Sequence, residues 1–265
     1  MKKKYIMIPI MILLFIVTVF RESLITYFNP LFKYVGQKNI VRSVKDYNML
    51  ETEHFIIRYK YEDTDEAIVT SKLSEKYYTN VTDMYGYKPK GKVQVIIYPN
   101  GEEMMNNTNL NEEVPPIGVY YSGVIHILDP KEWINDKENL NYIYEKEGPI
   151  VHEFAHLIID DITKGNYPMW LTEGLALYTE YKLTGFEIRE PLTEEETVSM
   201  KSLHDDFQDL NQEVAYRESF DIVKEISDEW GFNKINGILH TLGEGKNANK
   251  TIESVLKIQK GKLVY

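Results

Sequence analysis

The chain has 265 residues, no cysteine and a formal net charge of -11 at pH 7. The absence of cysteine excludes disulfides, thiolate metal ligands and a lipid anchor attached to cysteine. The acidic balance, with no basic stripe that would follow phosphates, argues against nucleic acid as a partner, and residues 51–265 suit one domain of two lobes.

The amino terminus predicts a membrane anchor. Three lysines at 2–4 precede sixteen residues without a charge, Tyr5–Phe20. As a helix this run is about 24 Å long, a little short of a bilayer core of about 30 Å, and apolar residues continue beyond Arg21. We therefore expect a cytoplasmic tail at 1–4 and a signal anchor at 5–27, with the rest of the chain outside the cell. Cleavage to a secreted form is the alternative, although no small-residue cleavage site follows Phe20.

The next part of the chain predicts the sheet of a domain. Residues 28–50 lack strong periodicity, so we expect a linker there. Runs of β-branched and aromatic residues predict strands at 53–60 and 92–98, and apolar residues at helical spacing predict a helix over 64–85.

The stretch up to residue 128 predicts a loop followed by more extended chain. Asn, Glu, Pro and Gly are frequent at 99–117, which predicts a surface loop. Residues 119–128 predict an extended segment with a turn or kink at Gly123. His126 alternates with isoleucines in this segment, and we expect it at the surface and not as a metal ligand.

The most informative pattern is H-E-x-x-H, which spans His152, Glu153 and His156. Two imidazoles four residues apart project from one helix face and can bind one zinc ion, with the glutamate placed to take a proton from water. Gly148-Pro149 precedes the motif as a helix start does, and residues 150–159 are apolar on nearly every side. Charged groups in so buried a helix need hydrogen-bonding partners or a metal ion. The alternative to a zinc site is a pair of hydrogen-bonded core histidines beside a salt-bridged glutamate.

A catalytic zinc site needs a third protein ligand and a fourth position for water. The continuation H-x-x-G-x-x-H is excluded because Ile159 and Ile162 occupy its Gly and His positions. The best candidate is Glu173, where Thr172 is expected to cap a new helix and Glu173 to lie in its first turn, facing the first helix. A first-turn acid that only favours the helix dipole is the alternative reading of Glu173.

The carboxy-terminal part predicts helices. An acidic run at 187–196 suggests a solvated loop and a helix start. Amphipathic spacing predicts helices at 221–230 and 234–242, separated at Gly231, and a last short helix at 249–257.

The motif around residues 152–156, followed by Trp-Leu-Thr-Glu-Gly-Leu-Ala at 170–176, resembles the gluzincin metallopeptidases. The closest resemblance is to the small bacterial peptidase MA-like domains. It extends over roughly residues 50–260, but only 148–180 carries sharp motifs. The resemblance implies His152, His156 and Glu173 as ligands of one zinc ion, and Glu153 as general base and acid.

The resemblance also implies a fold and further site residues. It implies an α+β, zincin-like domain of two lobes, with a small mixed sheet and an active-site helix followed by a helical lobe behind the transmembrane helix. Its edge strand would be residues 124–128 and would dock an extended peptide. Tyr216, in a later helix, would support the tetrahedral intermediate, with simple packing as the alternative.

The sequence departs from better-known gluzincins at two points. Leu177 stands where an Asp orients a ligand histidine, so that partner must be another group, such as Asp160, Asp161 or a backbone carbonyl. No Gly-x-Met-Glu-Asn stretch is present, which favours an endopeptidase over an aminopeptidase.

We therefore expect a membrane-anchored, extracytoplasmic zinc metallopeptidase that acts on peptides or proteins. A zincin fold that has lost activity and serves as a binding or sensing module at the cell surface is the alternative. A structural protein with an accidental motif is a further one, and it predicts no bound metal.

Overall fold

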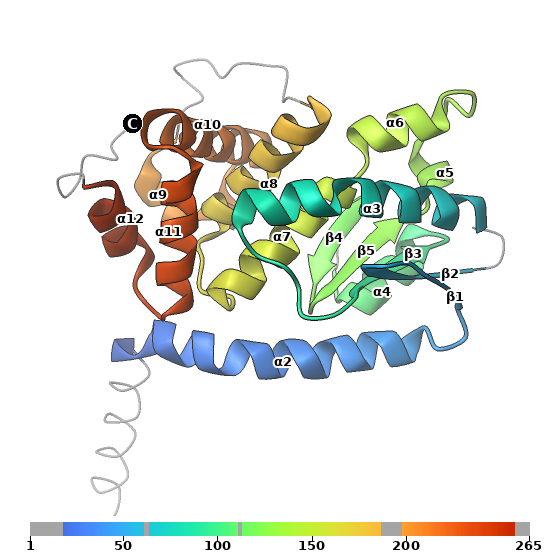
Figure 1. Cartoon of the computed structure of the whole chain (residues 1–265), viewed down its shortest axis with the longest axis horizontal. Coiled ribbons are helices and arrows are strands. Elements are labelled where there is room, and N and C mark those ends of the chain that lie inside the picture. The colour runs from blue at the N-terminus through green and yellow to red at the C-terminus, as the bar shows by residue number, and fades with distance from the viewer. Residues whose placement is uncertain (1–17, 61–63, 111–112, 187–197, 258–265) are drawn as a thin grey trace, which may run out of the picture.

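The computed structural model describes residues 18–60, 64–110, 113–186 and 198–257. Within these residues a mixed sheet lies beside a group of helices, with one long helix along the side of both (Figure 1). The first part of the chain comprises α2 (Arg21–Ser43), β1 (Asn48–Glu51), β2 (Phe55–Tyr59), α3 (Thr64–Tyr85), β3 (Val93–Tyr98), α4 (Gly101–Thr108), β4 (Gly118–Tyr121) and β5 (Val124–Leu128). The second part comprises α5 (Pro130–Trp133), α6 (Leu140–Glu147), α7 (Ile150–Thr163), α8 (Met169–Thr184), α9 (Met200–Asp205), η2 (Phe207–Asp209), α10 (Gln212–Trp230), α11 (Phe232–Gly243) and α12 (Ala248–Leu256).

This α+β arrangement agrees with the sequence prediction, and most element positions are confirmed. The strands expected at 53–60 and 92–98 are β2 and β3, and the helix expected at 64–85 is α3. The break at Gly231 separates α10 from α11 as predicted. The acidic run at 187–196 lies outside the described residues.

The sheet has the strand order β1-β2-β3-β5-β4. β2, β3 and β5 are parallel, and the two outer strands are antiparallel to their neighbours. β4 and β5 form a hairpin whose two turn residues, Ser122 and Gly123, have φ of 50° and 76°, as a two-residue turn of type I′ requires. The edge strand is therefore β4, and the expectation that 124–128 forms it is wrong, because β5 is paired on both sides.

Both faces of the sheet are covered. One face packs against α3 and α7 in the main core, which continues into the helical part. On the other face Ile96, Tyr98 and Val124 pack with Met104 of α4 and Ile40 of α2. The stretches expected as a linker (28–50) and a loop (99–117) thus contain the two helices that cover this face. Each helix buries few residues, Ile40 on α2 and Met104 with Thr108 on α4, so the sequence shows no apolar face of the kind that normally packs on a sheet.

The packing of α2 and α4 on this face of the sheet explains why the expectation of a surface position for His126 is wrong. This residue is fully buried on the second face, and its Nδ1 lies 2.9 Å from the hydroxyl of Tyr98, whose ring stacks on the imidazole. Burial lowers the pKa of His126 from its ordinary value of 6.5 to about 4.

The buried histidine predicts acid sensitivity. Since the folded protein binds this proton less readily than the unfolded chain, the stability is complete above about pH 6.5 and falls as the pH drops toward 4. The expected contribution between pH 7 and pH 5 is about 2 kcal/mol. Urea unfolding at both pH values should show it for the wild type. His126→Phe should be less stable at pH 7 yet lose less on acidification, and an unchanged difference between the two pH values would contradict this assignment.

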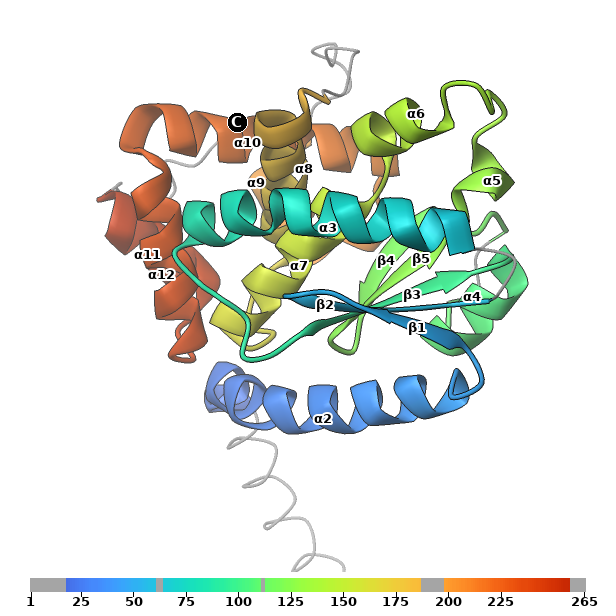
Figure 2. The same cartoon turned by 45° about the vertical axis from the view of Figure 1, so that its right-hand side comes forward.

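No helix in the described part of the chain is long and apolar enough to cross a bilayer. The transmembrane helix expected at 5–27 therefore finds no support there. Its residues 5–17 lie outside the described residues, and from Arg21 onward the chain belongs to α2. Figure 2 shows α2 lying along the sheet and the helices instead of projecting away from them.

A glycine permits the close packing of the helical part. Gly174 lies on α8 where α10 crosses it, and a Cβ at this position would stand 2.2 Å from the carbonyl oxygen of Ser219. Only a residue without a side chain allows this approach. Glu173 directly precedes Gly174 on α8. The close contact between α8 and α10 therefore fixes the position of the helix that carries Glu173.

Candidate metal centre

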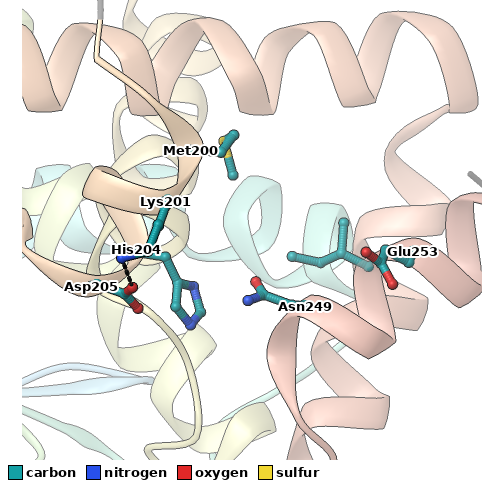
Figure 3. Close-up of a pocket in the computed structure, with 7 residues that line it drawn as sticks. Met200, Lys201, His204, Asp205, Asn249 and Glu253 are labelled. Carbon is teal, nitrogen blue, oxygen red and sulfur yellow. Dashed lines mark hydrogen bonds and ion pairs between the residues drawn. The ribbon is translucent and has the colours of Figure 1, made fainter. Parts of the chain in front are cut away.

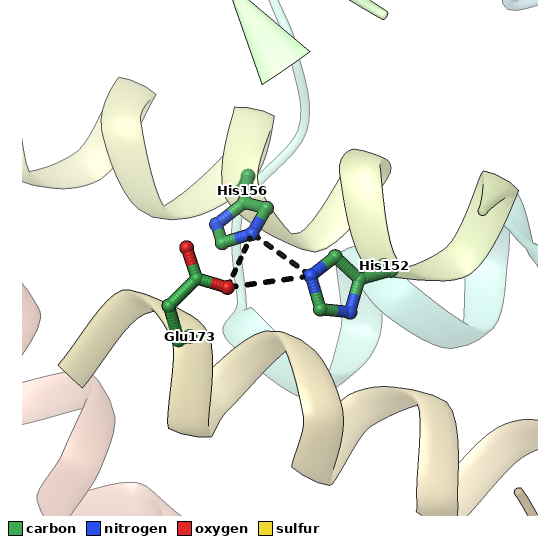
Figure 4. A group of neighbouring side chains, drawn as sticks. All are labelled: His152, His156 and Glu173. Atoms are coloured by element: carbon green, nitrogen blue, oxygen red, sulfur yellow. Dashed lines mark hydrogen bonds and ion pairs between the residues drawn. The ribbon is translucent and has the colours of Figure 1, made fainter. Parts of the chain in front are cut away.

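Helices α7 and α8 bring His152, His156 and Glu173 together (Figure 4). The two histidine Nε2 atoms lie 3.1 Å apart, and Glu173 Oε2 lies 3.5 Å from that of His152 and 3.4 Å from that of His156. These three nitrogen and oxygen atoms face one point between the helices. The structure thus groups the three residues that the sequence analysis proposed as ligands, and two imidazoles with one carboxylate form a donor set that suits a divalent metal ion.

The local sequence explains how the two helices present these groups. α7 begins at Ile150 directly after Pro149 and is buried on most of its surface, and its polar residues His152, Glu153 and His156 line the cleft. α8 begins at Met169, and not at Thr172 as expected, because Pro168 precedes it in extended conformation. Glu173 consequently lies in the second turn of α8, and its role as a simple first-turn acid is excluded.

Each histidine is held through its second ring nitrogen. His156 Nδ1 lies 2.7 Å from Thr172 Oγ1, and His152 Nδ1 lies 3.4 Å from Glu180 Oε2. Thr172 and Glu180 are both buried. Such contacts orient the ring so that Nε2 faces the metal position. From the sequence, Thr172 was expected only as a helix cap and Glu180 was not identified, although Glu180 follows Glu173 by two helical turns and therefore lies on the same face of α8.

Asp160 and Asp161, which the sequence left open as partners of the ligands, are used elsewhere. Lys33 Nζ of α2 lies 2.7 Å from Asp160 Oδ2 and 2.5 Å from Asp161 Oδ1. The hydroxyl of Tyr120 also donates to Asp160, over 2.7 Å. Both carboxylates thus fasten α2 to the end of α7, and Asp160 also fastens the edge strand there.

The carboxyl groups and imidazoles of the centre are strongly coupled. Burial acts to raise the pKa of Glu173, but the charges and hydrogen bonds of His156 and His152 outweigh it and hold that pKa far below its usual value. Burial acts to lower the pKa of His152, but hydrogen bonds to Glu173 and Glu180 outweigh it and raise that pKa. In the absence of a metal, protons on the imidazoles therefore balance the buried negative charge of Glu173. A bound metal cation would replace those protons.

Glu153 lies beside the ligand group but is not part of it. Its side chain is buried next to Gly118 of the edge strand, and the backbone N–H of Tyr120 donates to its carboxylate. Burial raises the pKa of Glu153, and the charge of Glu173 adds to this, against the opposing effect of the two imidazoles. A carboxylate with a raised pKa is a better proton acceptor near neutral pH.

Tyr216 of α10 faces the same centre. Burial raises the pKa of its phenol, with contributions from the charges of Glu173 and Glu153 and from a hydrogen bond to Glu173. Its ring also lies against that of Phe207. Tyr216 thus lines the same cleft as His152, His156 and Glu153, and its hydroxyl lies beside Glu173.

The centre lies in a cleft of about 670 Å³. One wall is the edge strand β4 with the residues before it, and the opposite wall comes from the start of α8 and from α10. The residues that line it are Leu110, Val114–Tyr120, His152, Glu153, His156, Tyr167, Met169, Thr172, Glu173, Gln212 and Tyr216. The volume suits several residues of an extended peptide or a small ligand.

A smaller cavity of about 220 Å³ lies between α9 and α12 (Figure 3). It contains His204, but Lys201 and Asp205 beside it form an ion pair on α9 over 2.9 Å. Among the described residues, the only group of three His or acidic side chains with the spacing of metal ligands is the one on α7 and α8. This group lines the larger cleft, which is therefore the candidate site.

Comparison with known proteins agrees with this geometry. No curated protein matches the chain. A family model, that of the Peptidase MA superfamily, matches residues 77–263, which extend from the second half of α3 past α12 and include every residue of the centre. The match covers well over half of the sequence and identifies a peptidase-type domain. The chain belongs to the Peptidase MA superfamily.

Proposed function

We propose that the protein is a zinc-dependent endopeptidase of the gluzincin type. His152, His156 and Glu173 hold the zinc ion, and Glu153 acts as general base. The observation that carries the proposal is the convergence of three ligand atoms, 3.1 to 3.5 Å apart, in a cleft bordered by a sheet edge.

The spacing of these atoms fits zinc. Ligands at about 2.0–2.1 Å around a tetrahedral zinc ion lie about 3.3–3.4 Å from one another. The three observed separations bracket that value without movement of the helices. Two histidines and one glutamate also leave a fourth position for water, as catalytic zinc sites do.

The residues of the chain divide the catalytic work. When bound, zinc lowers the pKa of water and polarises the scissile carbonyl. Glu153 accepts the proton of the attacking water on its carboxylate and then transfers it to the leaving amine. The hydroxyl of Tyr216 donates to the oxyanion that develops on the carbonyl oxygen, as a preorganised donor.

The substrate pairs with β4 as an added strand. β4 is the outer strand of the sheet next to the centre, and in its pairing with β5 the backbone groups of Gly118 and the carbonyl of Tyr120 point away from β5, along the border of the cleft. Among the described residues that line the cleft, the only carboxylates are Glu153 and Glu173. No further acid is therefore placed there to bind a free amino terminus, which favours cleavage within a chain.

The location proposed for the enzyme is the outer side of a cell membrane. The uncharged run Tyr5–Phe20 behind the lysines at 2–4 supports a single-pass signal anchor with the domain facing out. The beginning of α2 at Arg21 shortens the anchor expected at 5–27 to the residues before it.

Metal analysis and proteolysis together test the function. The full chain, purified in detergent, should contain one zinc ion and hydrolyse an unfolded protein, and a chelator should stop the reaction. One zinc ion without hydrolysis of any unfolded protein would support the alternative of an inactive binding module. A folded protein that binds no zinc would overturn the proposal entirely.

Glu180 is expected to tune the affinity for zinc. Glu180→Gln keeps the volume of the side chain but removes the charge that lies 3.4 Å from His152 Nδ1. Loss of such a partner typically weakens metal binding by about 10- to 100-fold. Competition with a chromophoric chelator measures the affinity, and Glu218→Gln, on another buried carboxylate away from the cleft, is the matched control. Equal affinity in both variants would remove Glu180 from this role.

A further inference from the structure

Helix α2 has its apolar side turned outward. Eight of the fifteen large apolar side chains that are exposed within the described residues lie between Val19 and Val35. Tyr27 and Phe32 are the most open of them, with 77% and 68% of their surface exposed. The six on α2 itself recur at helical spacing and form one stripe, which we call the aromatic face: Tyr27, Phe28, Leu31, Phe32, Tyr34 and Val35.

The side of α2 that contacts the domain is mainly polar. Lys33 is fixed by the two aspartates of α7, and Gln37 donates to the carbonyl oxygen of Gly123 over 2.8 Å. At the start of the helix, Asn247 donates to Glu22 over 3.2 Å. Only toward its end does an apolar residue, Ile40, enter the core. A helix at a water-exposed surface normally has the opposite arrangement.

These contacts fix which side of α2 faces outward. Gly36 lies against Ser122, where a Cβ would come within 2.6 Å of the serine hydroxyl oxygen, so the helix cannot rotate without a clash. The ion pairs of Lys33 favour the same rotation. The aromatic face is therefore presented by the fold itself, and a contiguous exposed apolar stripe of this kind marks an interaction surface.

We propose that the aromatic face of α2 lies in the interface of a lipid bilayer, with the helix parallel to the membrane plane. The uncharged run Tyr5–Phe20 joins α2 directly, and its insertion would bring the start of α2 to the bilayer surface. Tyrosine is enriched at this depth of a bilayer, and phenylalanine and leucine are common on the apolar face of helices that lie there. This inference rests on the anchor proposed above, and not on the peptidase activity.

Charge supports the same partner. α2 carries four basic side chains and one acidic one, whereas the whole chain has a net charge of -11. Lys38 and Arg42 are exposed toward the end of the helix, where they can contact anionic head groups. The rest of the acidic domain would be repelled by the same surface, so α2 is the side that can approach it.

The chain's own amino-terminal run fits the aromatic face less well than a bilayer does. The run Tyr5–Phe20 is apolar on every side, so covering the face with it would leave its own outer side in water. The bilayer covers both at once.

Docking also has a consequence for the cleft, because Gly123, in the turn that follows β4, contacts α2. β4 is four residues long, so the cleft begins within about 13 Å of the membrane-facing helix.

Single-cysteine labelling of the full chain tests the proposal, since the natural sequence contains no cysteine. An environment-sensitive fluorophore is attached to Phe32→Cys, on the aromatic face, and to Tyr142→Cys, an exposed aromatic on α6, as matched control. Both proteins are reconstituted in vesicles of phosphatidylcholine and phosphatidylglycerol, with or without bromine on the acyl chains. Far-UV circular dichroism and zinc content verify that each labelled protein is folded.

The label at position 32 should emit at shorter wavelength and be quenched several-fold more by brominated lipid than the label at 142. If the protein floats with the vesicles but the two labels are equally open to water, the aromatic face is not bound to lipid and the anchor still stands. Protection at 32 without quenching by bromine would assign the face to a second copy or to the amino-terminal segment, and would overturn the proposal. Failure to float would remove the anchor and this inference together, whereas zinc content would still report on the peptidase centre.

Discussion

Replacement of Glu153 by glutamine is expected to abolish peptide hydrolysis while zinc binding remains unchanged. The carboxylate lies beside the ligand group but contributes no atom to it, so the metal keeps its three ligands. Glutamine has nearly the same shape and can still accept the N–H of Tyr120, but it cannot take up a proton. Loss of a general base typically costs a factor of about 10² to 10⁴ in rate.

The measurement is kcat on a fluorogenic peptide, with zinc content determined on the same preparation. Glu218→Gln is the matched control, because Glu218 is also a buried carboxyl with a pKa raised by burial, but it does not line the cleft. It should retain wild-type turnover. Wild-type kcat in Glu153→Gln would falsify the assignment of the base and leave the zinc site intact.

The grouping of the candidate ligands could be predicted from the sequence because most of its geometry is local. His152 and His156 lie four residues apart, and helix geometry alone places them on one face. The position of Glu173 depended on where the next helix would lie, and α8 does bring Glu173 to the two histidines although it begins earlier than expected. Thr172 was misassigned as a cap because its contact with His156 joins two helices and leaves no local pattern.

The sequence predicted the surroundings of the centre less well. Pairing between strands is not local, so two adjacent extended segments at 118–128 did not reveal which would be the edge. α2 was missed for a different reason. Its apolar residues face outward and its inward residues are polar, so the pattern that normally identifies a docked helix is inverted. The burial of His126 was missed as a consequence, because α2 and α4 cover it.

Removal of the third ligand is expected to remove the metal. In Glu173→Ala the two histidines remain, but two neutral imidazoles without a carboxylate bind zinc far more weakly than the complete set. The loss should exceed the 10- to 100-fold effect expected for Glu180→Gln, because Glu173 itself would contact the ion whereas Glu180 only orients His152. His152→Ala should lose the metal in the same way.

Thermal unfolding gives a readout that does not depend on activity. A metal that binds only the folded state at 100 times its dissociation constant adds about 2.7 kcal/mol of stability. For a domain of this size that corresponds to a rise in Tm of roughly 5–10 °C. The wild type and Glu218→Gln should show this rise on addition of zinc, and Glu173→Ala should not. Glu173→Gln, which keeps the side-chain volume, separates loss of the ligand from damage to the packing between α8 and α10. A full zinc-induced rise in Tm in both Glu173 variants would place the third ligand elsewhere in the cleft. No rise in Tm in the wild type would mean that the centre does not bind zinc.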